Sequence, residues 1–133
     1  MLPVAHAFCQ EMQINVSANN KSITVSADDK NTDKLFVIEG STAGNDFLTI
    51  RIINEEAAKD WKRSFSIYDS TRNAIKDFVL MKDGSYCTRI SELKTGVVPQ
   101  QDYYIYTMAI PKDPNKAMLV KVAPKLVCKI KIL

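Results

Sequence analysis

Histidine is almost absent from this chain: His6 is the one histidine among 133 residues. Catalytic triads use an imidazole as general base, so a histidine-based nucleophile is excluded for any form of the chain that lacks its first residues. The three cysteines lie far apart and form no C-x-x-C pair, which removes the usual zinc spacing. Phosphate-binding glycine patterns and the G-x-S-x-G motif are also missing. We therefore expect no catalytic residue, no metal site and no cofactor.

Long apolar runs and a strong charge excess are lacking too. No run approaches the roughly 18–20 residues that a membrane helix needs, so no membrane span is predicted. The net charge of +3 is too small to indicate a nucleic-acid partner. The charge is uneven, because residues 90–133 contain seven lysines and three acids. Lys129 and Lys131 alternate with apolar residues, which predicts the solvated face of a terminal edge strand.

The first nine residues, MLPVAHAFC, resemble the end of a secretory signal. Ala5-His6-Ala7 fits the small-x-small rule with cleavage before Phe8. The alternative is an irregular N-terminal arm, but the first clear strand pattern begins only at Met12. We expect residues 1–9 to be a signal remnant and residues 10–133 to form one domain. The expected location is secreted, periplasmic or at the cell surface.

Alternation with a period of two dominates the rest of the chain and predicts strands. Asn19-Asn20 and Asp83-Gly84 separate strand patterns and predict hairpin turns. Residues 54–60 are the one helical stretch, and residues 69–77 are predicted as a loop or irregular turn. Eight to ten short strands without βαβ alternation predict an all-β fold, an antiparallel β-sandwich of about eight strands. The predicted strands cover residues 12–27 (a hairpin), 35–38, 47–53, 61–68, 78–82, 85–90, 103–110, 118–122 and 126–133.

Two stretches carry a resemblance to known proteins. Asp102-Tyr103-Tyr104-Ile105-Tyr106 resembles the start of the late strand that bears the tyrosine corner of immunoglobulin-like sandwiches, and Trp61 resembles the central core tryptophan of that fold. The stretch CQEMQINV, after the signal-like residues, is similar to the start of small secreted proteins of the Bacteroidota. That group includes adhesion modules and small protease inhibitors built on β-sandwiches. The resemblance implies a secreted immunoglobulin-like β-sandwich and transfers no functional residue.

Cys87 and Cys128 allow two interpretations. An even pair of cysteines in an oxidising compartment indicates a disulfide. The alternation places Cys128 with Ile130 on the core face. Cys87 lies on the other face of its strand from Tyr86 and Ile90, which puts it on the outside. Cysteines on different faces cannot bridge without distortion, which favours two buried or half-buried free thiols.

Exposed aromatics and loops are the candidate binding features. The alternation of residues 103–110 predicts that Tyr104, Tyr106, Met108 and Ile110 face the core, and their neighbours the outside. Exposed aromatic side chains are favoured interface anchors, and loops on a rigid scaffold often carry recognition. The candidate binding residues are therefore Tyr68, Tyr103, Ile105, Asn45, Asp46 and Arg72.

These features predict a noncatalytic secreted module that binds a protein or a glycan. The first alternative is an inhibitor of a secreted protease that inserts one exposed loop into the active-site cleft. The second alternative is a subunit of a surface assembly that completes a sheet edge with a partner strand. A small enzyme ranks last, because no residue pattern singles out a catalytic group.

Overall fold

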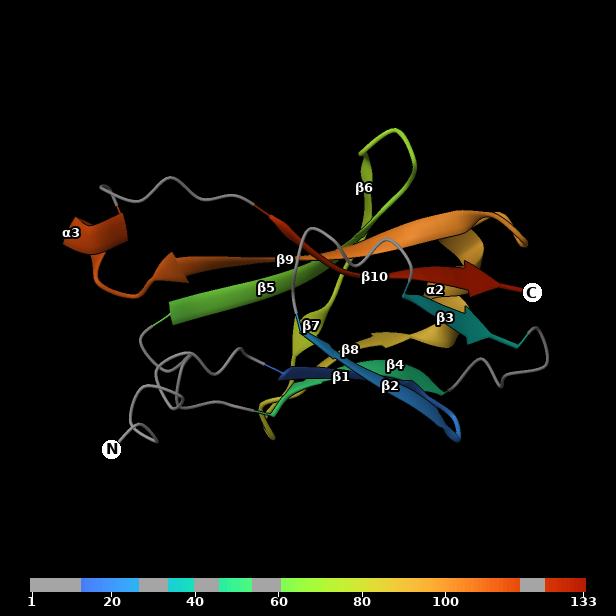
Figure 1. Cartoon of the computed structure of the whole chain (residues 1–133), viewed down its shortest axis with the longest axis horizontal. Coiled ribbons are helices and arrows are strands. Elements are labelled where there is room, and N and C mark those ends of the chain that lie inside the picture. The colour runs from blue at the N-terminus through green and yellow to red at the C-terminus, as the bar shows by residue number, and fades with distance from the viewer. Residues whose placement is uncertain (1–12, 27–33, 40–45, 54–60, 118–123) are drawn as a thin grey trace, which may run out of the picture.

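Two five-stranded β-sheets form a sandwich in the computed structural model of this chain (Figure 1). The structure describes residues 13–26, 34–39, 46–53, 61–117 and 124–133. Sheet A has the strand order β2-β1-β4-β8-β7, and sheet B has the order β3-β10-β9-β5-β6. The strands are β1 (Gln13–Ala18), β2 (Lys21–Ser26), β3 (Leu35–Ile38), β4 (Phe47–Ile52), β5 (Trp61–Tyr68), β6 (Ala74–Asp77), β7 (Val79–Leu80), β8 (Tyr86–Arg89), β9 (Asp102–Pro111) and β10 (Lys125–Ile132). The predicted β-sandwich is confirmed.

Sheet B is mixed, and this differs from the wholly antiparallel prediction. β3 runs parallel to β10, with Leu35 opposite Lys129 and Ile38 opposite Ile132. β10 therefore lies between β3 and β9 and is not the edge strand that the sequence predicts. Alternation along a strand reports which face each side chain occupies, but it carries no information on how many neighbours the strand has. Lys129 and Lys131 do lie on the outer side of the sheet, where both are half-buried.

Both predicted hairpin turns are confirmed. Asn19 lies between β1 and β2 with a φ of 57°, a conformation that asparagine tolerates better than most residues. Gly84 lies between β7 and β8 with a φ of 89°, which strongly favours glycine. The Gly84 N–H donates to the Met81 carbonyl at 3.0 Å, and the Met81 N–H donates to the Ser85 carbonyl at 2.7 Å. These turns fix the register of the two hairpins of sheet A.

The face assignment of β9 is wrong in the sequence-based prediction. Ile105 is 0% exposed and Tyr103 is 5% exposed, so both lie in the core between the sheets. Ile105 lies opposite Ile67 of β5 and Cys128 of β10, and both of these are fully buried. Each alternating set of β9 contains aromatic and aliphatic residues, so the pattern within this strand does not discriminate between its faces. The pairing with buried residues of β5 and β10 decides it.

The buried Tyr103 keeps its hydroxyl paired. The Val98 N–H donates to Tyr103 Oη at 2.7 Å, and Tyr103 Oη lies 3.5 Å from Gln101 Oε1. A tyrosine near the start of a strand that bonds backbone a few residues upstream is the arrangement of a tyrosine corner. The bond ties the connection before β9 to the core.

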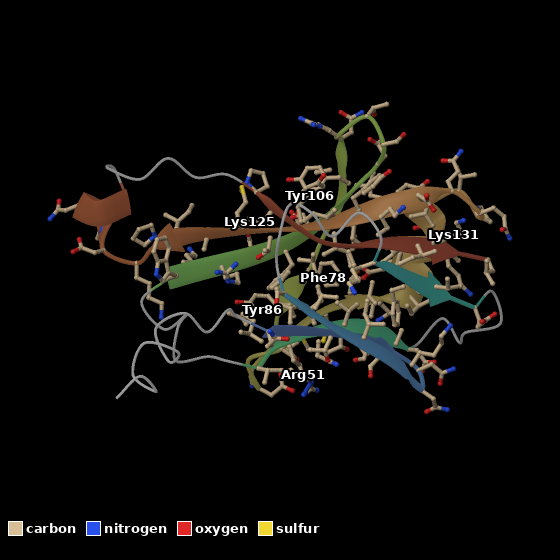
Figure 2. The ribbon with its side chains drawn as sticks, in the orientation of Figure 1. Arg51, Phe78, Tyr86, Tyr106, Lys125 and Lys131 are labelled. Atoms are coloured by element: carbon tan, nitrogen blue, oxygen red, sulfur yellow. The ribbon has the colours of Figure 1, made fainter. Side chains whose placement is uncertain are left out.

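The two sheets are joined along one edge by a continuous segment. β6 pairs with β5 in sheet B, β7 pairs with β8 in sheet A, and Phe78 alone separates them. The Phe78 N–H donates to the Phe65 carbonyl at 3.0 Å, and the Phe78 side chain lies between the sheets (Figure 2). At the opposite edge, Lys21 Nζ of β2 donates to the Val37 carbonyl of β3 at 3.1 Å. The sandwich is thus closed by backbone on one side and held by a side chain on the other.

The helical segments differ from the prediction. The predicted helix at residues 54–60 lies outside the described residues. A seven-residue helix, α2 (Ile90–Gly96), follows β8 where the sequence predicts the end of a strand. Ile90 and Leu93 are three positions apart and both buried, so this turn packs one side on the core. A further short helix, α3 (Pro114–Ala117), follows β9.

Two other expectations are wrong. Residues 74–77 form the strand β6, although the sequence predicts a loop or irregular turn from 69 to 77. Trp61 is 37% exposed, so it is not the central core tryptophan of an immunoglobulin-like fold. It stands at the first position of β5, opposite Pro111, where the sandwich ends. The predicted strand at residues 118–122 lies outside the described residues.

Candidate functional site

Three tyrosines gather on the outer face of sheet B. Tyr68 of β5 lies opposite Tyr104 of β9, and the rings of Tyr68 and Tyr106 pack edge to face with centroids 5.4 Å apart and planes at 90°. All three side chains are half-buried. Figure 2 shows Tyr106 on the side of sheet B that faces away from sheet A. We call Tyr68, Tyr104 and Tyr106 the tyrosine face.

Cationic side chains border the tyrosine face. Lys129 of β10 lies opposite Tyr104, and no ion pair involves Lys129 among the described residues. Two positions further along β10, Lys131 Nζ lies 3.5 Å from Asp102 Oδ1. The partly exposed surroundings make this ion pair weak. The face therefore combines aromatic rings with at least one cation that has no anionic partner in the described part of the chain.

A structured loop projects beside the tyrosine face, directly after Tyr68. Asp69 Oδ1 accepts hydrogen bonds from the Thr71 N–H at 2.9 Å, the Thr71 hydroxyl at 2.7 Å and the Asn73 N–H at 2.9 Å. These hydrogen bonds lower the pKa of the exposed Asp69 carboxyl below its usual value, and the bond from the Asn73 N–H has the largest effect. Arg72 has a φ of 67° and is exposed. We call residues 69–73 the β5–β6 loop, which stands away from both sheets in Figure 1.

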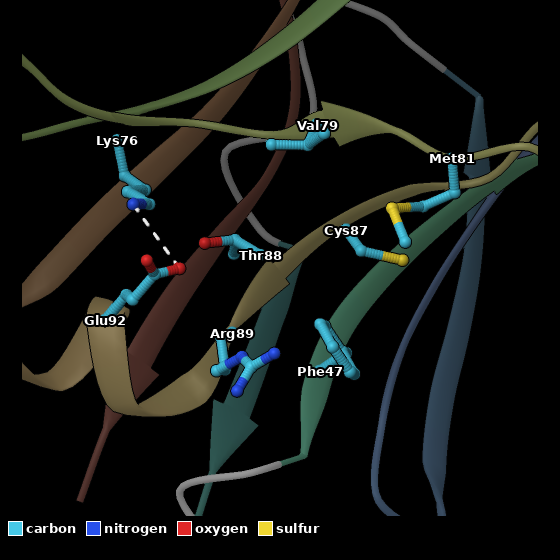
Figure 3. Close-up of a pocket in the computed structure, with 8 residues that line it drawn as sticks. All are labelled: Phe47, Lys76, Val79, Met81, Cys87, Thr88, Arg89 and Glu92. Carbon is cyan, nitrogen blue, oxygen red and sulfur yellow. Dashed lines mark ion pairs between the residues drawn. The ribbon is translucent and has the colours of Figure 1, made fainter.

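A hollow lies beside β8, where the chain crosses from β6 of sheet B to β7 of sheet A. It has a volume of about 330 Å³, and a neighbouring hollow of about 470 Å³ shares three of its lining residues, Phe47, Met81 and Cys87. The first hollow is lined by Phe47, Lys76, Val79, Met81, Cys87, Thr88, Arg89 and Glu92 (Figure 3). The Arg89 guanidinium lies 5.3 Å from the centre of the Phe47 ring, which is a cation–π distance.

Cys87 stands at the wall shared by both hollows and takes part in a hydrogen-bond chain. Its Sγ lies 3.6 Å from Ser85 Oγ and 3.5 Å from Thr49 Oγ1. The Ser85 hydroxyl donates to Asp83 Oδ1 at 2.6 Å, so its own proton is used and the thiol is the donor toward Ser85. Hydrogen bonds from Ser85 also lower the pKa of the exposed Asp83 carboxyl. The chain fixes the thiol at the hollow and supplies no base to activate it.

The two described cysteines are free. Cys128 lies between the sheets, where burial raises the pKa of its thiol to about 12. Cys87 is on the outer side of sheet A, because it lies opposite Thr49 while its neighbours Tyr86 and Thr88 lie opposite the buried Ile50 and Leu48. The disulfide considered from the sequence is therefore not formed, and the placement of the two thiols on different faces agrees with the alternation.

The sequence-predicted site residues fall in different parts of the fold. Tyr68 and Arg72 come together on one hairpin, beside the tyrosine face. Tyr103 and Ile105 are core residues, so their prediction as exposed anchors is wrong. Asp46 is half-buried, and its carbonyl accepts from the Ile90 N–H at 2.8 Å at the start of α2. Asn45 lies outside the described residues.

Sequence reasoning missed Tyr104, Tyr106 and the residues of the hollow. For the two tyrosines, the missing signal was the pairing of β9 with buried residues of its neighbours. The hollow follows from the shortness of β7, which the apolar run Phe78-Val79-Leu80-Met81 hides. No periodicity within a single strand reports where its neighbour stops.

Comparison with known proteins adds no relative: no protein-family model, no curated protein and no solved structure matches this chain. Within the described ranges, no group of three or more potential metal-ligating side chains is present. The same ranges contain no helix of the length and hydropathy needed to cross a membrane.

Proposed function

We propose that this chain is a noncatalytic, secreted binding module that recognises a partner protein through the tyrosine face and the β5–β6 loop. The observation that carries the proposal is the position of Tyr68, Tyr104 and Tyr106 directly beside a loop already ordered by Asp69. Tyrosine buries a large area at low entropic cost, and a preformed loop loses little freedom on binding. A sheet face and a loop on one rigid hairpin therefore suit recognition.

A protein partner is favoured over a glycan by the geometry of the rings. Tyr68 and Tyr106 stand at 90° to each other, whereas a sugar-binding groove needs aromatic rings with coplanar open faces. Perpendicular tyrosines present an edge, a face and hydroxyl groups at once, which suits a mixed protein surface. The proposal includes an immunoglobulin-like fold. The hydrogen bond from the Val98 N–H to the Tyr103 hydroxyl supports it, whereas the parallel pairing of β3 with β10 departs from the antiparallel sheets of that fold.

The test measures binding to a panel of secreted and cell-surface proteins and to a glycan array. We expect a protein partner whose affinity falls at least tenfold with Tyr106→Ala, because central aromatic residues dominate interface energies. Phe47→Ala is the matched control: it removes a partly exposed aromatic ring from the opposite side of the molecule. A partner that binds Tyr106→Ala and Phe47→Ala equally well contradicts the proposed surface, and a hit confined to glycans contradicts the partner class.

Protease inhibition is a second candidate, favoured by the β5–β6 loop alone. The loop projects, is held by hydrogen bonds to Asp69, and exposes Arg72. The left-handed φ of Arg72 differs from the extended backbone of a substrate, so the loop would act as a plug and not as a cleavable mimic. A trypsin-like protease blocked at one-to-one stoichiometry, with relief by Arg72→Ala but not by Tyr106→Ala, would establish this role. A panel of proteases that all stay active removes it.

A further inference from the structure

The hollow beside β7 contains a buried polar group that the fold leaves unsatisfied. Thr88 is 3% exposed, and its Oγ1 has no hydrogen-bond partner among the described residues. The other buried serine and threonine of the described residues, Ser85 and Thr107, have hydrogen-bond partners at 2.6 and 2.9 Å. A buried hydroxyl without a partner is destabilising, so natural structures rarely keep one without a reason.

The position of Thr88 explains why its hydroxyl lacks a partner within the fold. β7 covers only Tyr86 and Cys87 of β8, because the chain crosses to sheet B at Phe78. The side of β8 at Thr88 is bordered instead by Lys76 of β6 and Glu92 of α2, whose charged groups lie 3.6 Å apart. Figure 3 shows the Thr88 hydroxyl turned toward this ion pair.

The charge around the two hollows favours an anion. Their lining contains four cationic side chains and two acidic ones, which leaves an excess of two positive charges. Arg89 contacts the Phe47 ring and has no ion pair with an acid in the described part of the chain. The Lys76–Glu92 pair is partly exposed, and such pairs contribute little stability. An incoming carboxylate can therefore replace Glu92 at Lys76 without a large cost.

The rest of the hollow is apolar. Phe47, Val79 and Met81 line it, and all three are exposed large hydrophobic residues. The two adjoining hollows, with volumes of about 330 and 470 Å³, fall in the size range of small-molecule sites. Their shared wall of Phe47, Met81 and Cys87 allows an elongated ligand to extend from one into the other.

We propose that this hollow binds a small organic carboxylate with an apolar tail. The carboxylate lies beside Lys76 and Arg89 and accepts a hydrogen bond from the Thr88 hydroxyl. The tail covers Val79, Met81 and Phe47. This site shares no residue with the tyrosine face or the β5–β6 loop, so it is distinct from the proposed protein-binding surface.

The probe is sodium octanoate, with 1-octanol as its uncharged counterpart, measured by isothermal titration calorimetry on the full chain. For a probe of this size we expect a Kd of about 0.1–1 mM for octanoate. Octanol should bind at least tenfold more weakly, because it lacks the charge. The alkylation rate of Cys87, followed by peptide mass spectrometry, reports the location and should fall when octanoate is bound.

Three variants test the head-group position. Thr88→Val removes the hydroxyl at nearly constant shape and should weaken octanoate binding about tenfold, since hydrogen bonds to charged groups are the stronger ones. Arg89→Gln should weaken it by a similar factor. Glu92→Gln should tighten binding severalfold, because it removes the competing carboxylate and leaves Lys76 free. Thr88→Val should also fold at least as stably as the parent chain, because an unsatisfied buried group has been removed.

Matched controls are available at the other edge of the sandwich, where β2 of sheet A meets β3 of sheet B. Thr24→Val changes an exposed strand threonine, and Glu39→Gln breaks the comparable Lys21–Glu39 pair of 3.7 Å. Both should leave octanoate binding unchanged. The proposal is overturned if octanoate shows no binding at 10-fold the expected Kd, or if octanol binds as tightly as octanoate. It is also overturned if Thr88→Val, Arg89→Gln and Glu92→Gln all behave like the controls.

Discussion

The face assignment of β9 can be tested with one matched pair of substitutions, Ile105→Ala and Ile110→Ala. Both residues are isoleucines on the same strand, five positions apart, and therefore on opposite faces. The structure makes Ile105 fully buried and leaves Ile110 40% exposed. The alternation read from sequence alone predicts the reverse. The relative stability of the two variants therefore decides between the two assignments.

The burial of each side chain sets the expected magnitudes. The change to alanine removes three carbon groups, each worth about 0.8 kcal/mol when fully buried, and at Ile105 it also leaves a cavity between the sheets. We expect Ile105→Ala to lower the free energy of unfolding by about 3 kcal/mol. At Ile110 the removed groups are partly in solvent already and no enclosed cavity results, so the loss should be about 1 kcal/mol. The lower strand propensity of alanine affects both variants alike.

The assay is equilibrium unfolding in urea, followed by circular dichroism and by the fluorescence of Trp61. With a slope of about 2 kcal/mol per molar urea, the midpoint should fall by about 1.5 M for Ile105→Ala and about 0.5 M for Ile110→Ala. Ile105→Val, which removes a single carbon, is the milder variant and should cost about 1 kcal/mol. A larger loss at Ile110 than at Ile105 would refute the register of β9 with β5 and β10, and the tyrosine face with it.

Three other predictions concern single groups. Tyr103→Phe removes the acceptor at the tyrosine corner and should cost about 1 kcal/mol in urea unfolding; a variant as stable as the parent would deny the hydrogen bond any role. Asp69→Ala should speed hydrogen exchange at the Asn73 amide. Because hydrogen bonds lower the Asp69 pKa, the loop should stay ordered above the usual aspartate pKa and loosen only as the pH falls through the lowered pKa. Amide chemical shifts of the loop, recorded against pH, measure this transition. Iodoacetamide at pH 8 should modify Cys87 but not Cys128 in the folded chain, since burial raises the Cys128 pKa to about 12. In urea, both cysteines should react. Equal reaction in the folded state would contradict the burial of Cys128.

The sandwich and its turns were predictable from the sequence because they depend on local signals. Asn19 and Gly84 mark the two hairpins through their tolerance of positive φ, and the alternation gave the strands that they connect. The parallel pairing of β3 with β10 was not predictable, because it joins segments about ninety residues apart. Nothing within either segment specifies that partner or its direction.

The candidate sites were less accessible to sequence reasoning for a related reason. The tyrosine face depends on which of two chemically similar rows of β9 turns inward, and residues on other strands decide that. Tyr68 was found because it ends a clear strand alternation, and Arg72 because it lies in a predicted loop. Thr88 gave no signal, since its special property is the lack of a neighbour. Such a property exists only once the whole sheet is assembled.

Phe78 links the two candidate surfaces through the closure of the fold. Its place in the core and its bond to the Phe65 carbonyl require the chain to leave sheet B after Asp77 and join sheet A at once. On the sheet B side, the same segment returns from the β5–β6 loop and holds that loop beside the tyrosine face. On the sheet A side, only two residues remain to pair with β8, so Thr88 stays uncovered. The projecting loop and the hollow are therefore two consequences of one crossing, and neither is a defect of packing.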